Sequence, residues 1–319
     1  MSDTYESCTV GRDFIETLEY RRFAEFCDEC RRYRYIGLCY GQSGVGKTLS
    51  ARHYTGWQTI QNVDVCNIPD DVLISLARAC RLDTVLYTAS VVNTPRNLVE
   101  GITHARFLLH RIAHEPALRK HTAVIRRKQR KYTRELEAHF DRQDWMKLDG
   151  PPVAPPPRPP YTELAEEFAR RENGMADPTN LVLIDEADRL RMASLEMARD
   201  IFDRNEIGLV LIGMPGMERR LARYPQFYSR IGFVHEFRRL SASELRKLLE
   251  RAWTPPGVHL PPMDEETIAA VVRITGGNFR LLDRLLAQTE RILEINQIPE
   301  VTLQAVEAAR ASLVIGHTG

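Results

Sequence analysis

The feature that most constrains this 319-residue chain is the glycine-rich segment Gly41–Thr48, GQSGVGKT. Residues 35–40 (YIGLCY) predict a short buried strand before it, and the residues from Lys47 to about Tyr54 predict a helix after it. Glycines let the backbone wrap with its N–H groups pointing inward, and the helix that follows presents its positive end. The segment matches G-x-x-x-x-G-K-[ST] in full, so we expect it to hold the phosphates of ATP.

Within this loop we expect a division of roles. Lys47 would reach the β- and γ-phosphates and take part in catalysis, and Thr48 would ligate Mg²⁺. The other residues that we expect to contact ATP here are Gly41, Gln42, Ser43, Gly44, Val45, Gly46 and Leu49.

A second motif is the apolar run 181–184 (LVLI), which ends in Asp185 and is typical of a strand buried on both faces. A carboxylate at the end of such a strand can hold Mg²⁺, so we assign Asp185 to the metal. Glu186 can then polarise the attacking water. The alternative is a surface acidic turn formed by Asp185, Glu186 and Asp188; the four apolar residues and the phosphate loop favour the metal site.

The rest of the chain predicts an α/β core followed by a small helical unit. Strands are expected at residues 84–88, 209–212 and 233–237, and helices at residues 12–32 and from Pro95 to about His110. Strands separated by helices imply a parallel sheet of five strands flanked by helices. Beyond residue 240, four helices are expected, opened by a Ser241-x-x-Glu244 capping box, Asp264, Asn278 and Thr302. We therefore divide the chain into a helical segment 1–33, a core 34–239 and a helical domain 240–319.

The core carries an unusual insertion, at about residues 113–160. Residues 119–134 contain eight Lys or Arg and no acidic residue, and residues 151–160 contain seven prolines. A proline run of this kind is polyproline-like or disordered, because each proline removes a donor and fixes φ. Residues 161–171 then predict a helix.

Overall charge identifies no partner, because 44 Lys and Arg balance 43 Asp and Glu to a net +1. A nucleic-acid surface must therefore come from a local patch. A patch of this kind can bind a nucleic acid through its phosphates, without sequence specificity. A solvated helix face is the alternative, since Glu135 and Glu137 begin to balance the charge. The predicted DNA contacts are Arg126, Arg127, Lys128, Arg130 and Lys131.

Other patterns exclude several classes of site. No stretch of about 20 apolar residues is present, so we expect no membrane partner and a cytoplasmic location.

Of the six cysteines, the Cys27-x-x-Cys30 pair lacks the second Cys/His pair of a zinc site. We interpret the cysteines as reduced structural thiols.

The phosphate loop, LVLIDEAD, a second apolar strand, Ser229-Arg230 and a helical module with GGNFR resemble the AAA+ ATPases. The resemblance implies a P-loop AAA+ core with a small C-terminal all-helical lid. It also implies an arginine finger at Arg230, which would reach the γ-phosphate of a neighbouring subunit, and a nucleotide sensor at Arg280. Arg223 and Arg219 are the alternative fingers.

One departure from that pattern is Gly213-Met214-Pro215, where the family usually has a polar side chain that helps to orient water. The departure implies either that hydrolysis of ATP to ADP and phosphate is slow or that another group orients the water.

Within AAA+, the stretches YRYIGLCYGQSGVGKTLSARHY and TVLYTASVVNTPRNLVEGI resemble the DNA-transposition ATPases, the group of the phage Mu B protein, TniB and TnsC. The similarity covers about residues 10–112 and 180–315. It implies a bacterial or phage-encoded, nucleoid-associated homo-oligomer, a ring or helical filament on duplex DNA, that marks target DNA and activates a transposase.

Two other functions stay open at this point. A helicase- or clamp-loader-type AAA+ protein would remodel a partner on DNA. A signalling or defence NTPase would be switched by ATP-driven oligomerisation.

Overall fold

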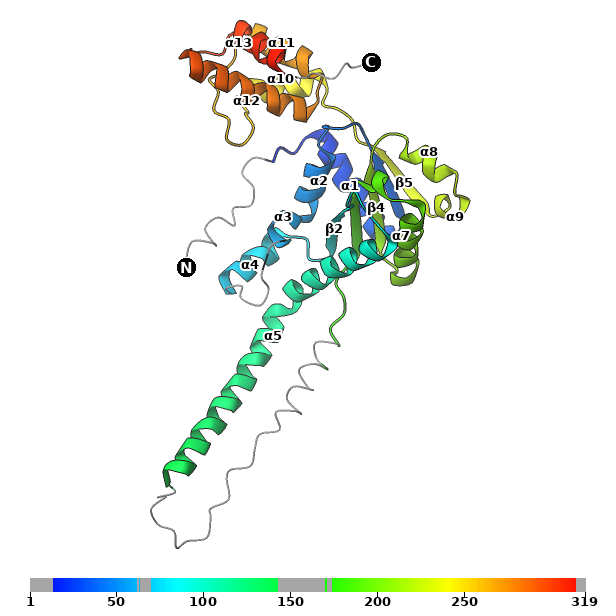
Figure 1. Ribbon diagram of the computed structural model, residues 1–319, viewed down its shortest axis with the longest axis vertical. Helices are drawn as coiled ribbons and strands as arrows, with labels where there is room; N and C mark the ends of the chain where they lie inside the picture. The colour runs from blue at the N-terminus through cyan, green and yellow to red at the C-terminus, as the bar shows by residue number, and fades with distance from the viewer. Residues whose placement is uncertain (1–13, 62, 64–69, 143–169, 171–173, 314–319) are drawn as a thin grey trace.

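The computed structural model describes residues 14–61, 63, 70–142, 170 and 174–313 (Figure 1). Among them, five strands form one sheet in the order β2-β3-β4-β1-β5, and every neighbouring pair is parallel. The predicted α/β fold, a five-stranded parallel sheet flanked by helices, is confirmed. The strands are β1 (Ile36–Tyr40), β2 (Thr84–Thr88), β3 (Leu181–Asp185), β4 (Gly208–Gly213) and β5 (Ile231–Glu236).

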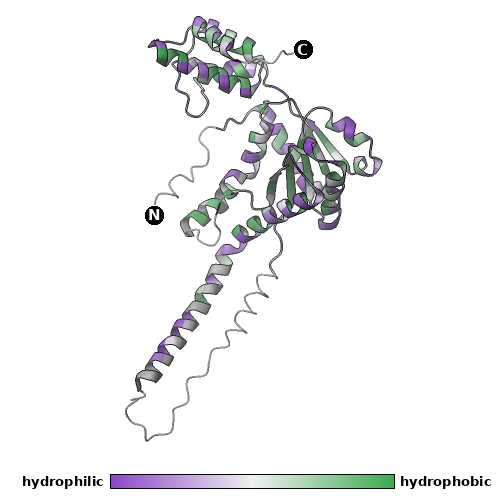
Figure 2. Ribbon diagram, in the orientation of Figure 1, coloured by the Kyte–Doolittle hydropathy of each residue, from purple (hydrophilic) through white to green (hydrophobic). Residues whose placement is uncertain are grey.

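The central strands are apolar because both of their faces are covered. Strands β3 and β4 are buried at every position, and Leu38 on β1 pairs with Leu211 on β4. Figure 2 shows the strands as hydrophobic segments between more hydrophilic helices. Since the strands are parallel, the carboxyl ends of β1, β3 and β4 lie at the same edge of the sheet. That edge receives the glycine-rich loop, Asp185 and Met214.

Helices cover this sheet. Helix α1 packs against β4 and β5, α2 against β2 and β3, and α5 against β2 and α7. The helices of the core, with the 3₁₀ turn η1, are α1 (Leu18–Tyr33), α2 (Lys47–Thr55), α3 (Trp57–Ile60), α4 (Asp70–Ala79), α5 (Pro95–Arg142), η1 (Ala187–Arg189), α7 (Met192–Asn205), α8 (Met217–Ala222) and α9 (Pro225–Tyr228).

Helix α1 begins six residues later than the predicted start at residue 12, because the hydroxyl of Thr17 accepts a hydrogen bond from the N–H of Tyr20 and caps it. Its inner face, which includes Phe23, Cys27 and Cys30, belongs to the same hydrophobic core as the sheet. Burial raises the pKa of the Cys30 thiol to about 12, and Cys27 and Cys30 are free thiols. The domain boundaries at residues 33 and 239 stay predictions.

Helix α5 is longer than predicted, since it continues past His110 to Arg142 and includes Pro116. Its contacts with the core end near Ile112, which is fully buried. Beyond that point the helix projects away from the sheet (Figure 1). The structure also places α3 and α4 in the stretch after Tyr54, where the sequence showed little pattern; Leu73 and Leu76 of α4 enter the core.

The C-terminal unit is all-helical, as predicted, and has its own apolar core, formed by residues such as Leu245, Val271 and Leu286. The predicted caps are present: Ser241 and Glu244 form a capping box, and Asp264 accepts from the N–H of Thr267. The helices are α10 (Ala242–Glu250), α11 (Glu265–Thr275), α12 (Phe279–Asn296) and α13 (Leu303–Ser312).

Among the described residues, no helix is both long enough and apolar enough to cross a membrane. The proline-rich segment 151–160 and nearly all of the helix expected over residues 161–171 lie outside them.

A half-buried histidine lies where α1 meets the edge strand β5. The His235 ring packs against Phe23 and Phe26, with centroid separations of 6.2 and 5.5 Å, and its Nε2 lies 3.2 Å from Oε1 of Glu19. Burial lowers the pKa of His235 to about 4, helped by the nearby guanidinium groups and opposed by Glu236. Burial raises the pKa of Glu19. The interior between α1 and β5 therefore favours the neutral form of both groups. The two guanidinium groups belong to Arg22 and Arg238.

This site predicts a pH dependence of stability. Because the unfolded chain binds a proton at His235 near pH 6.5 and the folded chain only near 4, the free energy of unfolding should fall as the pH drops through this window. His235→Phe should flatten that fall, as measured by chemical denaturation from pH 8 to pH 4. The raised pKa of Glu19 changes the free energy of unfolding in the opposite direction, but Glu19 is present in both wild type and His235→Phe. His104→Phe on the exposed surface of α5 is the control, and equal slopes for His235→Phe and wild type would contradict the prediction.

Candidate functional site

The glycine-rich loop leaves the end of β1 and wraps before it enters α2. The N–H of Gly41 donates to the carbonyl of Gly213 at 3.3 Å, which ties the start of the loop to the end of β4. Gly44 and Gly46 have φ of +80° and +110°, a region that side-chain-bearing residues rarely adopt. Helix α2 then begins at Lys47, so its unpaired N–H groups face the loop. This is the geometry that the motif predicted.

Lys47 points back into the loop. Its Nζ donates to the carbonyl oxygens of Gly41 at 2.5 Å and Gln42 at 2.9 Å, and lies 4.0 Å from Sδ of Met214. Burial lowers the pKa of Lys47, although the carboxylates around the cleft oppose the shift. The ammonium group therefore lies at the centre of the loop.

Asp185 ends β3 at the same edge. It is 2% exposed, and its Oδ1 accepts the N–H of Glu186 at 2.9 Å. Its Oδ2 is buried without a hydrogen-bond partner among the described residues. An unpaired buried carboxylate oxygen is costly, and a bound cation would remove that cost.

Glu186 turns the chain out of the sheet. Its φ of 55° is in the left-handed region, and it leads directly into η1. Its carboxylate lies 3.6 Å from Nη2 of Arg189, and Nη1 of that arginine donates to the carbonyl of Ala89 at the end of β2. Glu186 lines the cleft beside Asp185.

These groups share one cleft of about 420 Å³, which lies between the loop, the ends of β3 and β4, and helix α12. Thr48 lines it together with Asp185, so a hydroxyl and a carboxylate oxygen are available to a hard cation. Mg²⁺ commonly binds one or two protein oxygens and completes its shell with phosphates and water. The donor set therefore fits Mg²⁺ bound together with a nucleotide. The lining residues are Ser43, Gly44, Gly46, Lys47, Thr48, Leu49, Asp185, Glu186, Asp188, Arg189, Gly213, Met214, Phe279, Arg280 and Asp283.

The C-terminal helical unit closes one side of this cleft. Arg280 Nη1 donates to Oγ of Ser43 at 2.7 Å, and the Arg280 N–H donates to the carbonyl of Gly44 at 3.1 Å. Asn278 Nδ2 donates to the carbonyl of Ser43 at 2.9 Å. Arg280 therefore lies at the cleft, next to the loop. The sequence reasoning missed Asn278, although it stands beside Arg280 in GGNFR, and it missed Arg239, which bonds to Gln42.

The AAA domain family matches residues 30–221, more than half of the chain. The chain belongs to the AAA domain family. A Staphylococcus aureus protein described as "Potential ATP-binding protein" is 37% identical over 318 residues, which cover 97% of this chain and 99% of that protein.

Solved structures are more distant from this AAA domain protein. The ORC1 protein of Aeropyrum pernix in complex with DNA is 19% identical with a TM-score of 0.48, and the match covers 92% of this chain and 64% of that one. The RuvB Holliday junction branch migration motor of Thermotoga maritima is 12% identical with a TM-score of 0.49, covering 95% and 71%.

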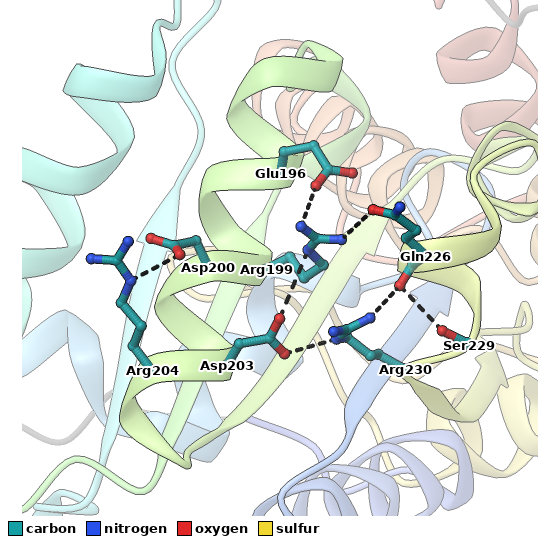
Figure 3. Close-up of polar contacts among 8 residues, drawn as sticks. All are labelled: Glu196, Arg199, Asp200, Asp203, Arg204, Gln226, Ser229 and Arg230. Atoms are coloured by element: carbon teal, nitrogen blue, oxygen red, sulfur yellow. Dashed lines mark hydrogen bonds and ion pairs between the residues drawn. The ribbon is translucent and has the colours of Figure 1, made fainter.

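Arg230, the expected finger of the AAA domain, does not line the chain's own cleft. Its Nε donates to Oδ1 of Asp203 at 2.8 Å, and its Nη1 donates to the carbonyl of Gln226 at 2.7 Å (Figure 3). Its carbonyl accepts the N–H of Ile36, the first residue of β1, so it lies at the sheet edge opposite the loop. The alternatives Arg219 and Arg223 are exposed, at α8 and just after it.

The predicted DNA contacts lie on the projecting part of α5. Arg127, Arg130 and Lys131 are exposed, and their spacing of three and four residues places them with Arg134 on one face of the helix. Lys131 lies 3.8 Å from Glu135, an exposed pair. Arg126 and Lys128 belong to the same helix, but their side chains lie outside the described set.

The contact between the loop and α12 can be tested at Gly44. Its φ is +80°, and a Cβ there would lie 2.4 Å from Oδ1 of Asn278. Gly257 has φ +82° with no atom within 4 Å of its Cβ position. We expect Gly44→Ala and Gly257→Ala each to cost about 1 kcal/mol in unfolding free energy for the left-handed backbone. Only Gly44→Ala should speed hydrogen exchange at the Arg280 amide, because this N–H donates to the carbonyl of Gly44. Equal exchange in the two variants would show that the start of α12 does not depend on the glycine-rich loop.

Proposed function

We propose that this chain is an ATPase, which binds ATP with Mg²⁺ in the cleft and hydrolyses it slowly to ADP and phosphate. The observation that carries the proposal is the buried Oδ2 of Asp185, unpartnered among the described residues and facing the same cleft as the glycine-rich loop. The description of the staphylococcal relative as a potential ATP-binding protein supports the choice of nucleotide.

Each group at the cleft has a role in this reaction. The N–H groups of the loop and of the first turn of α2 would bind phosphate oxygens, and Lys47 would exchange its loop carbonyls for the β- and γ-phosphates. Thr48 and Asp185 would hold Mg²⁺, whose charge offsets that of the phosphates. Glu186 would accept a proton from the attacking water. Arg280, from the lid, would contact the nucleotide beside Ser43.

We further propose that ATP drives assembly of a homo-oligomer, a ring or helical filament. The position of Arg230 supports this proposal, because it lies at the sheet edge opposite its own cleft, where it would face a neighbouring subunit rather than the chain's own nucleotide. It would have to leave Asp203 to do so. Each bound ATP would then join two subunits.

The assembly would form on duplex DNA and serve transposition, by marking target DNA and recruiting and activating a transposase. The exposed basic face of α5 supports the DNA part, because Arg127, Arg130 and Lys131 stand on a helix that projects from the core. Phosphate contacts of this kind give affinity without sequence specificity. The proposed transposase partner rests on the resemblance of two segments to the DNA-transposition ATPases. One is YRYIGLCYGQSGVGKTLSARHY, which contains the phosphate loop, and the other is the later segment TVLYTASVVNTPRNLVEGI.

The central test is the pair Glu186→Gln and Lys47→Ala. Glu186→Gln keeps the metal ligand Asp185 and should lower turnover by about 100-fold or more, while assemblies persist on random duplex DNA with ATP. Lys47→Ala should bind neither ATP nor DNA. Turnover assays and negative-stain microscopy would measure both.

Wild-type protein that shows no affinity for duplex DNA with a non-hydrolysed ATP analogue at low salt would end the DNA proposal. Assembly without DNA would instead favour a signalling switch, and a small closed complex with a defined protein would favour a loader.

The basic face needs its own control. Five substitutions to Gln on α5 should reduce the salt dependence of DNA binding, by about 0.9 in the log–log slope for each lost phosphate contact. Five exposed arginines of the lid provide a variant with the same change in charge, which should keep the wild-type slope. An unchanged slope in the α5 variant would assign its patch to ordinary surface. The α5 set is Arg126, Arg127, Lys128, Arg130 and Lys131, and the lid set is Arg251, Arg273, Arg284, Arg291 and Arg310.

A further inference from the structure

The end of β4 lacks the polar side chain that the AAA+ resemblance leads one to expect, since Gly213, Met214 and Pro215 occupy it. The structure shows another polar group there. We propose that the carboxylate of Asp188 takes the place of the missing side chain and orients the attacking water together with Glu186. The proposal rests on the proposed ATPase function.

The carboxylate of Asp188 occupies space that a side chain on β4 would take. Its Oδ1 accepts the N–H of Met214 at 3.1 Å. A Cβ added to Gly213 would lie 3.0 Å from the same oxygen, closer than ordinary contact. The glycine at the end of β4 thus leaves room for a carboxylate that comes from the neighbouring strand's turn.

Asp188 is also held in place by its backbone. Arg220, on α8, donates from Nη1 to the carbonyl of Asp188 at 2.9 Å and from Nη2 to the carbonyl of Leu190, which is fully buried. The N–H of Arg189 donates to the carbonyl of Glu186 at 3.0 Å and closes η1. Asp188 therefore stands two residues after Glu186 on a short, fixed turn, and both side chains line the same cleft.

Two carboxylates beside the phosphate site can hold a water molecule by both of its protons. The water oxygen would attack the γ-phosphorus, and the bond to the β–γ bridging oxygen would break, leaving its electron pair on ADP. One proton would pass to Glu186, while Asp188 keeps a hydrogen bond to the other. Lys47, which interacts electrostatically with Asp188, offsets part of the second negative charge near the γ-phosphate.

A merely structural Asp188 would do no more than accept the N–H of Met214. Asp188→Asn separates the two roles, because the amide oxygen can still accept that N–H while Nδ2 replaces the second carboxylate oxygen. Glu218→Gln is the matched control: Glu218 accepts the N–H of Gly216 at 2.8 Å in the same turn and does not line the cleft.

We expect Asp188→Asn to lower kcat by about 100-fold, the lower end of the range for a lost acid–base partner, with KM for ATP and Tm close to those of Glu218→Gln. In equilibrium binding it should weaken ADP–aluminium fluoride, which mimics the γ-phosphoryl group in transfer, by about 10-fold and leave a non-hydrolysed ATP analogue unchanged. Equal kinetics and binding in the two variants, or equal weakening of both nucleotides, would overturn the proposal. Wild-type protein that binds neither nucleotide would overturn the ATPase function and, with it, this role.

Discussion

The parallel pairing of β1, β3 and β4 is the constraint on which the rest of the molecule depends. These strands are buried on both faces, so their register is fixed by packing, and their carboxyl ends must lie at one edge. The glycine-rich loop, Asp185 and the Gly213 turn come from distant parts of the sequence and meet only because of this pairing. The N–H of Gly41 donates a hydrogen bond to the carbonyl of Gly213, which joins the glycine-rich loop to the Gly213 turn.

Electrostatics then give that edge its chemistry. Asp185 carries a buried oxygen with no hydrogen-bond partner in the described part of the chain, and the loop offers backbone N–H groups and Lys47 a short distance away. A buried unpaired carboxylate oxygen is unfavourable by itself, and so is a ring of unpaired N–H groups. A magnesium–phosphate group would satisfy both at once. The unliganded site therefore lowers the stability of the folded chain, and ligand binding would restore it.

The sequence predicted the parts of this site that are local. Lys47 and Thr48 follow from a motif set between a strand and a helix, and Asp185 follows from four apolar residues ahead of it. Contacts made across the fold could not be predicted that way. The pair Arg230–Asp203 joins α7 to the turn between α9 and β5, and Asp188 reaches β4 only because residue 213 is a glycine. The length of α5 was missed for a different reason, since the described side chains of its outer half are exposed and give no apolar pattern to mark it.

The central claim is that Asp185 and the glycine-rich loop form one site for a metal–nucleotide complex. Calorimetric titration of ATP with and without Mg²⁺, on wild type and Asp185→Asn, tests it most directly. We expect Mg²⁺ to tighten ATP binding to the wild type by about 10-fold or more, which is the size of effect seen when residues that support a metal site are replaced. Asp185→Asn should remove most of this gain in affinity. Equal affinity for ATP with and without Mg²⁺ in the wild type, or an undiminished Mg²⁺ effect in Asp185→Asn, would contradict the account.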